Sequence, residues 1–369
     1  MMRRIGADPD RVLLRLPLEL RYADGFHLRA PRAPCPFNLL FALLGAKRLS
    51  LAQVPGAVRF MAALRAKAFN VGADRPVARW LDEHAQTGVL RSHLWEPLCV
   101  SALNTPVELA SAQVFANVLR DGLTGKRENS DILLARTDLG RLFPEPAAGY
   151  VKARGGTIEL GASVRTLTRE GGGFRLDDRP QRFTAAIVAC APQHAAPLLS
   201  GFEELAATRA VIEQLDYQPI VTCYLQYPES VSLPAPMLGL GGGMVQWVFD
   251  RGRLGGSRGE NAGLLAAVIS ASGPHMELTQ EALASRIDIE LNATLGALPP
   301  LRWTRVITEK RATFSCTPGV RRPQAVTAVP GLTLAGDYVA SDYPGTLESA
   351  VRSGITAASR TIESLTARL

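Results

Sequence analysis

The residues best suited to chemistry in this sequence lie near its C-terminus. Ala335-Gly336-Asp337 follows a short apolar run, and TLESAVRSG (346–354) comes after a loop through Tyr343-Pro344-Gly345. The pattern predicts a strand over 332–335 that ends at a carboxylate, followed by a helix from Thr346. The first N–H groups of a helix lack intrahelical acceptors and attract anions. We therefore expect an anionic or electron-rich cofactor edge to bind at this helix N-terminus.

The same helix combines two kinds of position. Apolar residues step by three or four, which predicts an amphipathic helix, at Leu347, Ala350, Val351, Ile355, Ala358, Ile362 and Leu365. Small residues at Ser349, Ser353, Gly354 and Ala357 would let the helix approach a sheet or a ligand closely. The helix is thus expected to pack tightly beside the strand.

Other chemistries find little support in the sequence. No two of the five histidines have metal-ligand spacing, and neither a G-x-S-x-G elbow nor a P-loop is present, so no metal is expected. The five cysteines lie at least 33 residues apart and form no C-x-x-C pair, which favours a reduced, cytoplasmic setting. No run of 18 or more apolar residues occurs.

The elements around this segment predict an α/β fold with three parts. Residues 1–149 read as mainly helical, with a hairpin over 12–29, helices within 38–68, 76–93 and 106–125, and an ordered loop over 95–106. Residues 150–205 and 328–369 read as a parallel-sheet domain, with strands over 157–170, 174–178 and 183–190. Residues 206–327 read as an antiparallel sheet with strands over 217–227, 244–250, 263–270 and 301–314 and a helix over 279–296.

Positive charge is concentrated at the start of the chain. Residues 1–70 hold twelve Lys or Arg and four acids, whereas the whole chain has a net charge of +7. A solvated basic face and an anionic membrane surface both fit this excess, and the run LLFALLGA (39–46) is too short to span a bilayer but suits its interface. Nucleic acid is not expected, because no recognition motif accompanies the charge. A peripheral position on the inner membrane face is therefore one expectation.

The C-terminal string resembles a known signature. A strand ending in A-G-D and a helix reading T-x-E-x-A-x-x-S-G are similar to the FAD signature of the flavin amine oxidase and phytoene desaturase superfamily. GGTIELGASVRTL (155–167) and AAIVACAP (185–192) match as well. Segments 95–123, 138–147, 223–228 and 309–323 look more narrowly like the squalene-associated FAD-dependent desaturases, also described as hydroxysqualene dehydroxylases.

The resemblance implies a Rossmann-like FAD-binding domain beside an α+β substrate domain, with FAD as the cofactor. The backbone of Val164 would contact the adenine side, and Gly336 and Asp337 the ribityl or pyrophosphate region. Backbone N–H groups of Thr346, Leu347 and Glu348 would meet the N1/O2 edge of the flavin ring. The implied substrate is a long isoprenoid alcohol, which loses its hydroxyl as hydride arrives from reduced flavin. The leucine-rich hairpin and the helices of 38–68 would line its channel, and other squalene-pathway enzymes are expected partners.

One departure from that family is large. Its members begin with a strand and a G-x-G-x-x-G turn that admits the pyrophosphate, and the present sequence contains no such motif. We expect the FAD domain to be N-terminally incomplete, through either a short gene model or a truncated remnant, and the chain to be unstable or poor in flavin.

The sequence identifies no catalytic acid. Tyr343, Asp342 and Glu96 are candidates because they lie in or beside the signature loops, although structural or capping roles fit each of them. Alternative functions are a carotenoid-type desaturase, an amine oxidase, and a non-catalytic remnant or membrane-associated partner of a squalene-making assembly.

Overall fold

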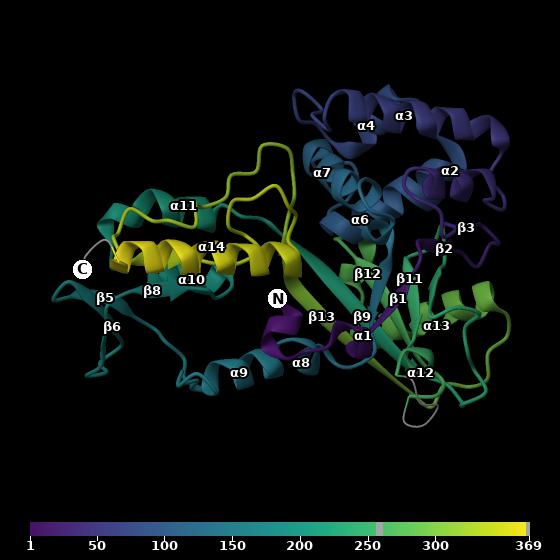
Figure 1. The fold of residues 1–369 in the computed structure, drawn as a ribbon. Coiled ribbons are helices and arrows are strands. Elements are labelled where there is room, and N and C mark those ends of the chain that lie inside the picture. The colour runs from purple at the N-terminus through teal and green to yellow at the C-terminus, as the bar shows by residue number, and fades with distance from the viewer. Residues whose placement is uncertain (256–260, 367–369) are drawn as a thin grey trace.

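Two lobes make up the molecule, and the long strands β9 (Tyr217–Gln226) and β13 (Trp303–Phe314) run between them (Figure 1). The structure is a computed structural model that describes residues 1–255 and 261–366. One lobe combines helices with a five-stranded antiparallel sheet, and the other holds a two-stranded parallel sheet with helices beside it. The predicted α/β class, with an antiparallel sheet in the second part, is confirmed.

The antiparallel sheet has the strand order β10-β11-β12-β9-β13. Its remaining strands are β10 (Met237–Gly239), β11 (Trp247–Asp250) and β12 (Leu264–Ser270). In β9, Val221, Cys223 and Leu225 are buried on one face, as the two-residue period of a strand requires. Helix α13 (Gln280–Leu295) packs on that face and completes a separate hydrophobic core. The predicted strands and the helix across them are confirmed.

Helices form the rest of this lobe around a buried aromatic core. Phe60 lies between Trp80 and Trp95, with ring centroids 4.9 and 5.4 Å away. The Trp95 indole N–H donates to Oε1 of Gln86 at 2.9 Å, which satisfies its polar atom inside the core. The helices are α2 (Phe37–Leu44), α3 (Val54–Ala66), α4 (Val77–Glu83), α5 (Gly88–Leu90), the π-helix η3 (Arg91–Trp95), α6 (Glu96–Leu103) and α7 (Ala112–Leu123).

Helix α6 corrects one prediction. Two prolines, Pro97 and Pro106, predict a loop over 95–106, yet residues 96–103 are helical. Pro97 occupies the first turn, where its fixed φ suits a helix and its missing N–H removes no intrahelical bond. Asn104 ends the helix in the left-handed conformation, with φ 44°.

The N-terminal hairpin is shorter than predicted. Strands β2 (Glu19–Arg21) and β3 (His27–Arg29) pair antiparallel, which confirms the turn between them. The run 12–22 is nevertheless not one strand, because Pro17 separates β2 from β1 (Leu13–Leu16). Strand β1 pairs instead with β4 (Ile132–Ala135), more than a hundred positions along the chain.

In the other lobe, β8 (Ala186–Val188) and β14 (Leu332–Leu334) pair in parallel. Beside them β5 (Leu167–Glu170), β6 (Gly173–Leu176) and β7 (Arg182–Phe183) form a small antiparallel sheet. Of the strands predicted over 157–170 only β5 forms. The backbone N–H groups of Arg165 and Thr166 donate to Oδ1 of Asp177 at 2.9 and 2.8 Å, so a side chain replaces a strand partner there.

Helix α14 (Leu347–Thr366) packs on the sheet through its small residues, as predicted. Its buried residues are Ser349, Ser353, Ala357 and Thr361, whereas Leu347, Ile355 and Ile362 are 75%, 48% and 64% exposed. The small polar stripe faces β14, where Thr361 and Thr333 hydroxyls lie 3.0 Å apart. Small side chains permit this close approach, so they decide the packing, and the apolar period of the helix does not.

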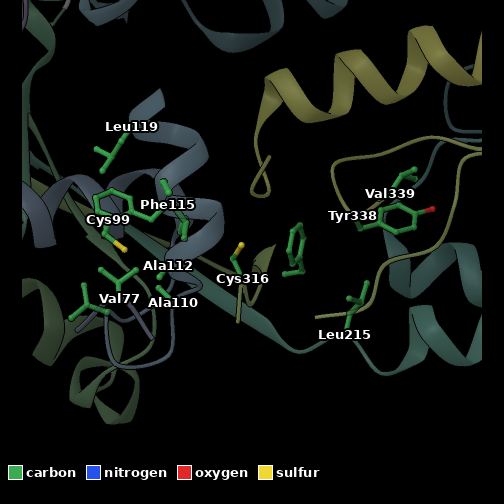
Figure 2. Close-up of a cluster of buried hydrophobic side chains, with 14 of the residues drawn as sticks. Val77, Cys99, Ala110, Ala112, Phe115, Leu119, Leu215, Cys316, Tyr338 and Val339 are labelled. Atoms are coloured by element: carbon green, nitrogen blue, oxygen red, sulfur yellow. The ribbon is translucent and has the colours of Figure 1, made fainter. Parts of the chain in front are cut away.

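A continuous buried cluster joins the two lobes. Figure 2 shows it running from Phe115 and Cys99 past Cys316 to Tyr338 and Val339. Shorter elements complete the chain: η1 (Met2–Ile5), α1 (Pro9–Val12), η2 (Leu51–Gln53), η4 (Arg127–Ser130), α8 (Leu139–Leu142), α9 (Pro144–Lys152), α10 (Pro192–Leu198), η5 (Glu203–Leu205), α11 (Ala206–Glu213), α12 (Arg251–Leu254) and η6 (Pro274–Glu277). Within residues 1–255 and 261–366, no helix has the length and apolar character needed to cross a bilayer.

Candidate functional site

The turn after β14 is built around Gly336. Its φ of +149° belongs to the region that favours glycine, and a Cβ there would lie 2.5 Å from the Tyr338 ring. Its N–H donates to Oγ of Ser353 at 2.8 Å, which ties the turn to α14. Because β14 is parallel to β8, this turn places Asp337 at the edge where both strands end.

Asp337 is a half-buried carboxylate. Burial raises its pKa, although nearby backbone N–H groups and the Arg322 guanidinium act in the opposite direction. Among the described residues no side-chain donor bonds the two carboxylate oxygens of Asp337. Its backbone carbonyl, in contrast, accepts from the Ser349 hydroxyl at 3.3 Å. The carboxylate can therefore accept a hydrogen bond from a ligand hydroxyl.

Arg322 holds the loop between Asp337 and α14. Its guanidinium donates to the carbonyls of Tyr343, at 2.9 Å, of Asp337, at 3.4 Å, and of Ser341. It also lies 5.0 Å from the ring centroid of Phe314. The sequence carries no local signal for this role, because the hydrogen bonds of the guanidinium span 15 to 21 positions.

The three candidate acids lie in different surroundings. The Tyr343 hydroxyl donates to Oδ2 of Asp121 at 2.8 Å, a bond that raises the tyrosine pKa, and the Asp342 carbonyl accepts from Asn117 at 3.0 Å. Both residues thus tie the loop to α7. Glu96 accepts from Nε of Arg91 at 2.6 Å at the start of α6. Their chemical roles stay predictions.

The start of α14 offers two backbone donors. The Thr346 hydroxyl accepts from the N–H of Ser349 at 3.2 Å and so caps the helix. Within the described chain, the N–H groups of Leu347 and Glu348 have no acceptor. The Glu348 side chain turns to Arg352, with an Oε1 to Nε distance of 2.6 Å. The two N–H groups are therefore free to meet an anionic edge.

A cavity of about 740 Å³ lies against β8. Val164 lines it beside Ala189, Cys190 and His194. Ile187, in the middle of β8, is 41% exposed, although parallel strands are normally covered on both faces. The structure thus brings Val164 to the same parallel strand pair that carries Asp337.

A second cavity, of about 480 Å³, lies in the helical lobe and is mostly apolar. Leu18, Leu20 and Leu28 from the hairpin region, Leu39 and Leu43 from α2, and Met61 from α3 line it. Trp95, Leu98, Trp247 and Phe249 complete its apolar wall. At its polar margin, the Asp131 side chain is 3% exposed and pairs with Arg15 and Arg127 at 3.3 and 3.4 Å.

Asn104 links the end of β12, beside this cavity, with β13. Its Oδ1 accepts from the N–H of Ala271, the neighbour of the cavity residue Ser270, at 2.8 Å. Its Nδ2 donates to Oγ1 of Thr313 at 3.0 Å. A Cβ on Gly345 would lie 3.0 Å from the Thr313 Cβ and 3.1 Å from Oδ2 of Asp337. A chain of contacts through Asn104, Thr313 and Gly345 thus runs from the strand beside the apolar cavity to the Asp337 turn.

Comparison with known families agrees with this geometry. Residues 29–362 match the family of flavin containing amine oxidoreductases. The chain belongs to this family. Its cofactor is FAD.

Two bacterial relatives of this chain carry a more specific name than the family. The chain is 31% identical to a hydroxysqualene dehydroxylase of Sinorhizobium fredii over 73% of its length, and 30% identical to one of Rhodopseudomonas palustris over 74%. The matched part covers 62% of each relative. The chain therefore spans less than two thirds of the length of these curated relatives.

Solved structures support the flavin oxidoreductase fold. Cyclohexylamine oxidase from Brevibacterium oxydans is similar over 99% of this chain and 85% of its own, with a TM-score of 0.66 at 18% identity. An oxidoreductase from Methanosarcina mazei is similar over 94% of this chain and 80% of its own, also with a TM-score of 0.66, at 16% identity.

The residues gathered around Asp337 and around Val164 would suit two ends of an FAD molecule. Asp337 and the free N–H groups of α14 would hold the ribityl chain and the ring edge, and the Val164 cavity would take the adenine side. The buried Tyr338 hydroxyl has no partner among the described residues, and Figure 2 shows it pointing away from Cys316. An unpaired buried hydroxyl beside this turn is consistent with a polar ligand there.

Proposed function

We propose that this protein is an FAD-dependent oxidoreductase that removes the hydroxyl group of a long isoprenoid alcohol, converting hydroxysqualene to squalene. The apolar cavity carries this proposal, because an isoprenoid chain needs a dry apolar wall around it. The relatives named hydroxysqualene dehydroxylase support the choice of substrate.

The reaction exchanges a C–OH bond for a C–H bond and releases water, so the substrate takes up a hydride and the departing hydroxide takes up a proton. Reduced FAD supplies the hydride when it is bound. The protein has to exclude water and orient the chain, and the leucines of the hairpin and α2 serve both needs. Ser101 and Ser270 are polar groups in the cavity wall that can orient the substrate hydroxyl.

The cavity favours an alcohol or hydrocarbon over an amine. Asp131 is the acidic residue in its lining, and its carboxylate is already paired with Arg15 and Arg127. An ammonium group entering an apolar cavity needs an uncompensated carboxylate or an aromatic cage to offset its desolvation. The paired Asp131 offers no such charge, so an amine would depend on the aromatic side chains Trp95, Trp247 and Phe249 of the wall alone.

Product analysis tests the proposal. The chain is loaded with FAD, binding is confirmed from the flavin absorbance, and the flavin is chemically reduced before hydroxysqualene is added without oxygen. We expect squalene, identified by mass spectrometry, only when flavin is bound. Bound flavin with unchanged hydroxysqualene, or turnover of phytoene or amines in its place, would overturn the assignment. An identical sample without FAD is the control.

A further inference from the structure

Helix α2 exposes an apolar face that no other described element covers. Phe37, Phe41 and Leu44 are 56%, 50% and 48% exposed, and the two phenylalanine rings lie 6.4 Å apart. Their spacing of four and three residues places all three on one face of the helix. Leu51, 66% exposed, extends the apolar surface beyond the C-terminus of α2. We call Phe37, Phe41, Leu44 and Leu51 the α2 outer face.

The opposite face of α2 lines the substrate cavity. Leu39, Ala42 and Leu43 contribute to the cavity wall. A helix about 10 Å wide therefore separates the apolar cavity from the apolar outer face. Continuity with the cavity distinguishes this surface from the scattered exposed apolar residues normal for a protein surface.

The charged residues in the sequence around α2 are all basic. Residues 25–73 contain no Asp or Glu and seven Lys or Arg. Arg29 and Arg48 lie 3.7 and 3.8 Å from the carboxylates of Glu19 and Asp24. In the part of the chain that the structure describes, the other five form no ion pair: Arg32, Lys47, Arg59, Arg65 and Lys67. The stretch of chain that carries the α2 outer face thus has five uncompensated cations and no acid.

We propose that the α2 outer face docks on an anionic phospholipid membrane, with its phenylalanines in the interface and the surrounding cations on the headgroups. Aromatic and aliphatic side chains inside a basic region are the combination that binds such a surface. The idea that the substrate enters the cavity from this membrane rests on the proposed function. The docking of the α2 outer face does not depend on that function. A symmetric dimer through this face would oppose like charges, which argues against a second copy.

Vesicle flotation of the full chain tests the docking. We expect binding to vesicles of phosphatidylcholine mixed with phosphatidylglycerol at low salt, weaker binding at high salt, and little binding to phosphatidylcholine alone. Phe37→Ser combined with Phe41→Ser should weaken anionic binding at least tenfold. The matched control, Ile289→Ser with Ile362→Ser, removes apolar residues that are 65% and 64% exposed elsewhere and should bind like the parent.

A second set of variants tests the charge. Lys47→Glu, Arg59→Glu and Lys67→Glu together should reduce binding about 100-fold, since each cation near an anionic surface contributes roughly a factor of five. The control triple Lys152→Glu, Arg302→Glu and Lys310→Glu reverses three exposed cations elsewhere and should have little effect. Equal binding to both lipids, or equal losses in test and control variants, overturns the proposal.

Size-exclusion chromatography with light scattering tests the alternative that a second copy of the chain covers the α2 outer face. If the Phe37→Ser, Phe41→Ser variant turned a dimer into a monomer and kept its lipid binding, the face would be an interface between copies and the proposal would fail. Circular dichroism verifies that each variant is folded. Because flotation needs neither flavin nor substrate, its outcome is independent of the squalene assay.

Discussion

Asn104 and Thr313, 209 positions apart, are joined by a hydrogen bond of 3.0 Å between Nδ2 and Oγ1. Thr313 in turn lies against Gly345, beside the Asp337 carboxylate. Asn104 itself is buried, with 4% of its surface exposed, and also donates to the carbonyls of Gln218 and Pro219. One amide thus ties the end of α6 to β9, to β13 and to the residue after β12.

Replacing Asn104 should separate its side-chain role from its backbone role. Asn104→Gly keeps the left-handed conformation but leaves buried polar groups unpaired, at a cost of about 2–4 kcal/mol in the free energy of unfolding. Asn104→Ala should cost about 1 kcal/mol more, because a Cβ disfavours φ near +44°. Urea unfolding measures both. An alanine variant as stable as the parent would contradict the role of Asn104.

Gly336→Ala should disrupt the turn that carries Asp337. The added Cβ meets the Tyr338 ring at 2.5 Å and the backbone conformation disfavours it, so we expect a loss of about 1–3 kcal/mol and weaker FAD binding. Gly354→Ala, in α14 with open space around it, is the control and should stabilise the protein by up to about 1 kcal/mol. Thermal unfolding and flavin fluorescence titration report the two effects. Unchanged flavin affinity in Gly336→Ala would count against this turn as the flavin site.

Asp337→Asn should raise stability without flavin and lower flavin affinity. Burial raises the pKa of Asp337 in the folded chain, so the folded state favours the protonated form. Its contribution to stability is therefore full below the ordinary aspartate pKa of about 3.9 and is lost as the pH rises through the raised value. The difference in unfolding free energy between variant and parent should appear at neutral pH and shrink towards pH 3.9 or so. A difference in unfolding free energy that does not change with pH would contradict a raised pKa for Asp337.

Leu43→Asp places a charge in the wall of the apolar cavity and should abolish turnover of an isoprenoid alcohol while flavin stays bound. Leu139→Asp, at a helix position that is 63% exposed and outside the cavity lining, is the control and should keep parental turnover. The measurement is squalene formed per bound flavin with detergent-dispersed substrate. Equal turnover in the two variants would show that the substrate does not occupy this cavity.

Local patterns predicted much of the fold. The antiparallel strands followed from apolar runs of the right length, and the strand, turn and helix at 332–366 followed from their apolar and small residues. The errors came where nearby groups competed with local preference: Pro97 suited the first turn of α6, and Asp177 took the N–H groups expected to pair in a strand.

The sequence by itself determined the Gly336-Asp337 turn and the basic character of residues 25–73, because backbone tolerance and charge belong to the residues themselves. The tertiary structure decided which face of α14 is buried, how Arg322 holds the loop, and that Asn104 meets Thr313. These depend on close packing between elements far apart in the chain. Complementary shape and paired polar atoms select such contacts, and neither is visible in a local run of residues.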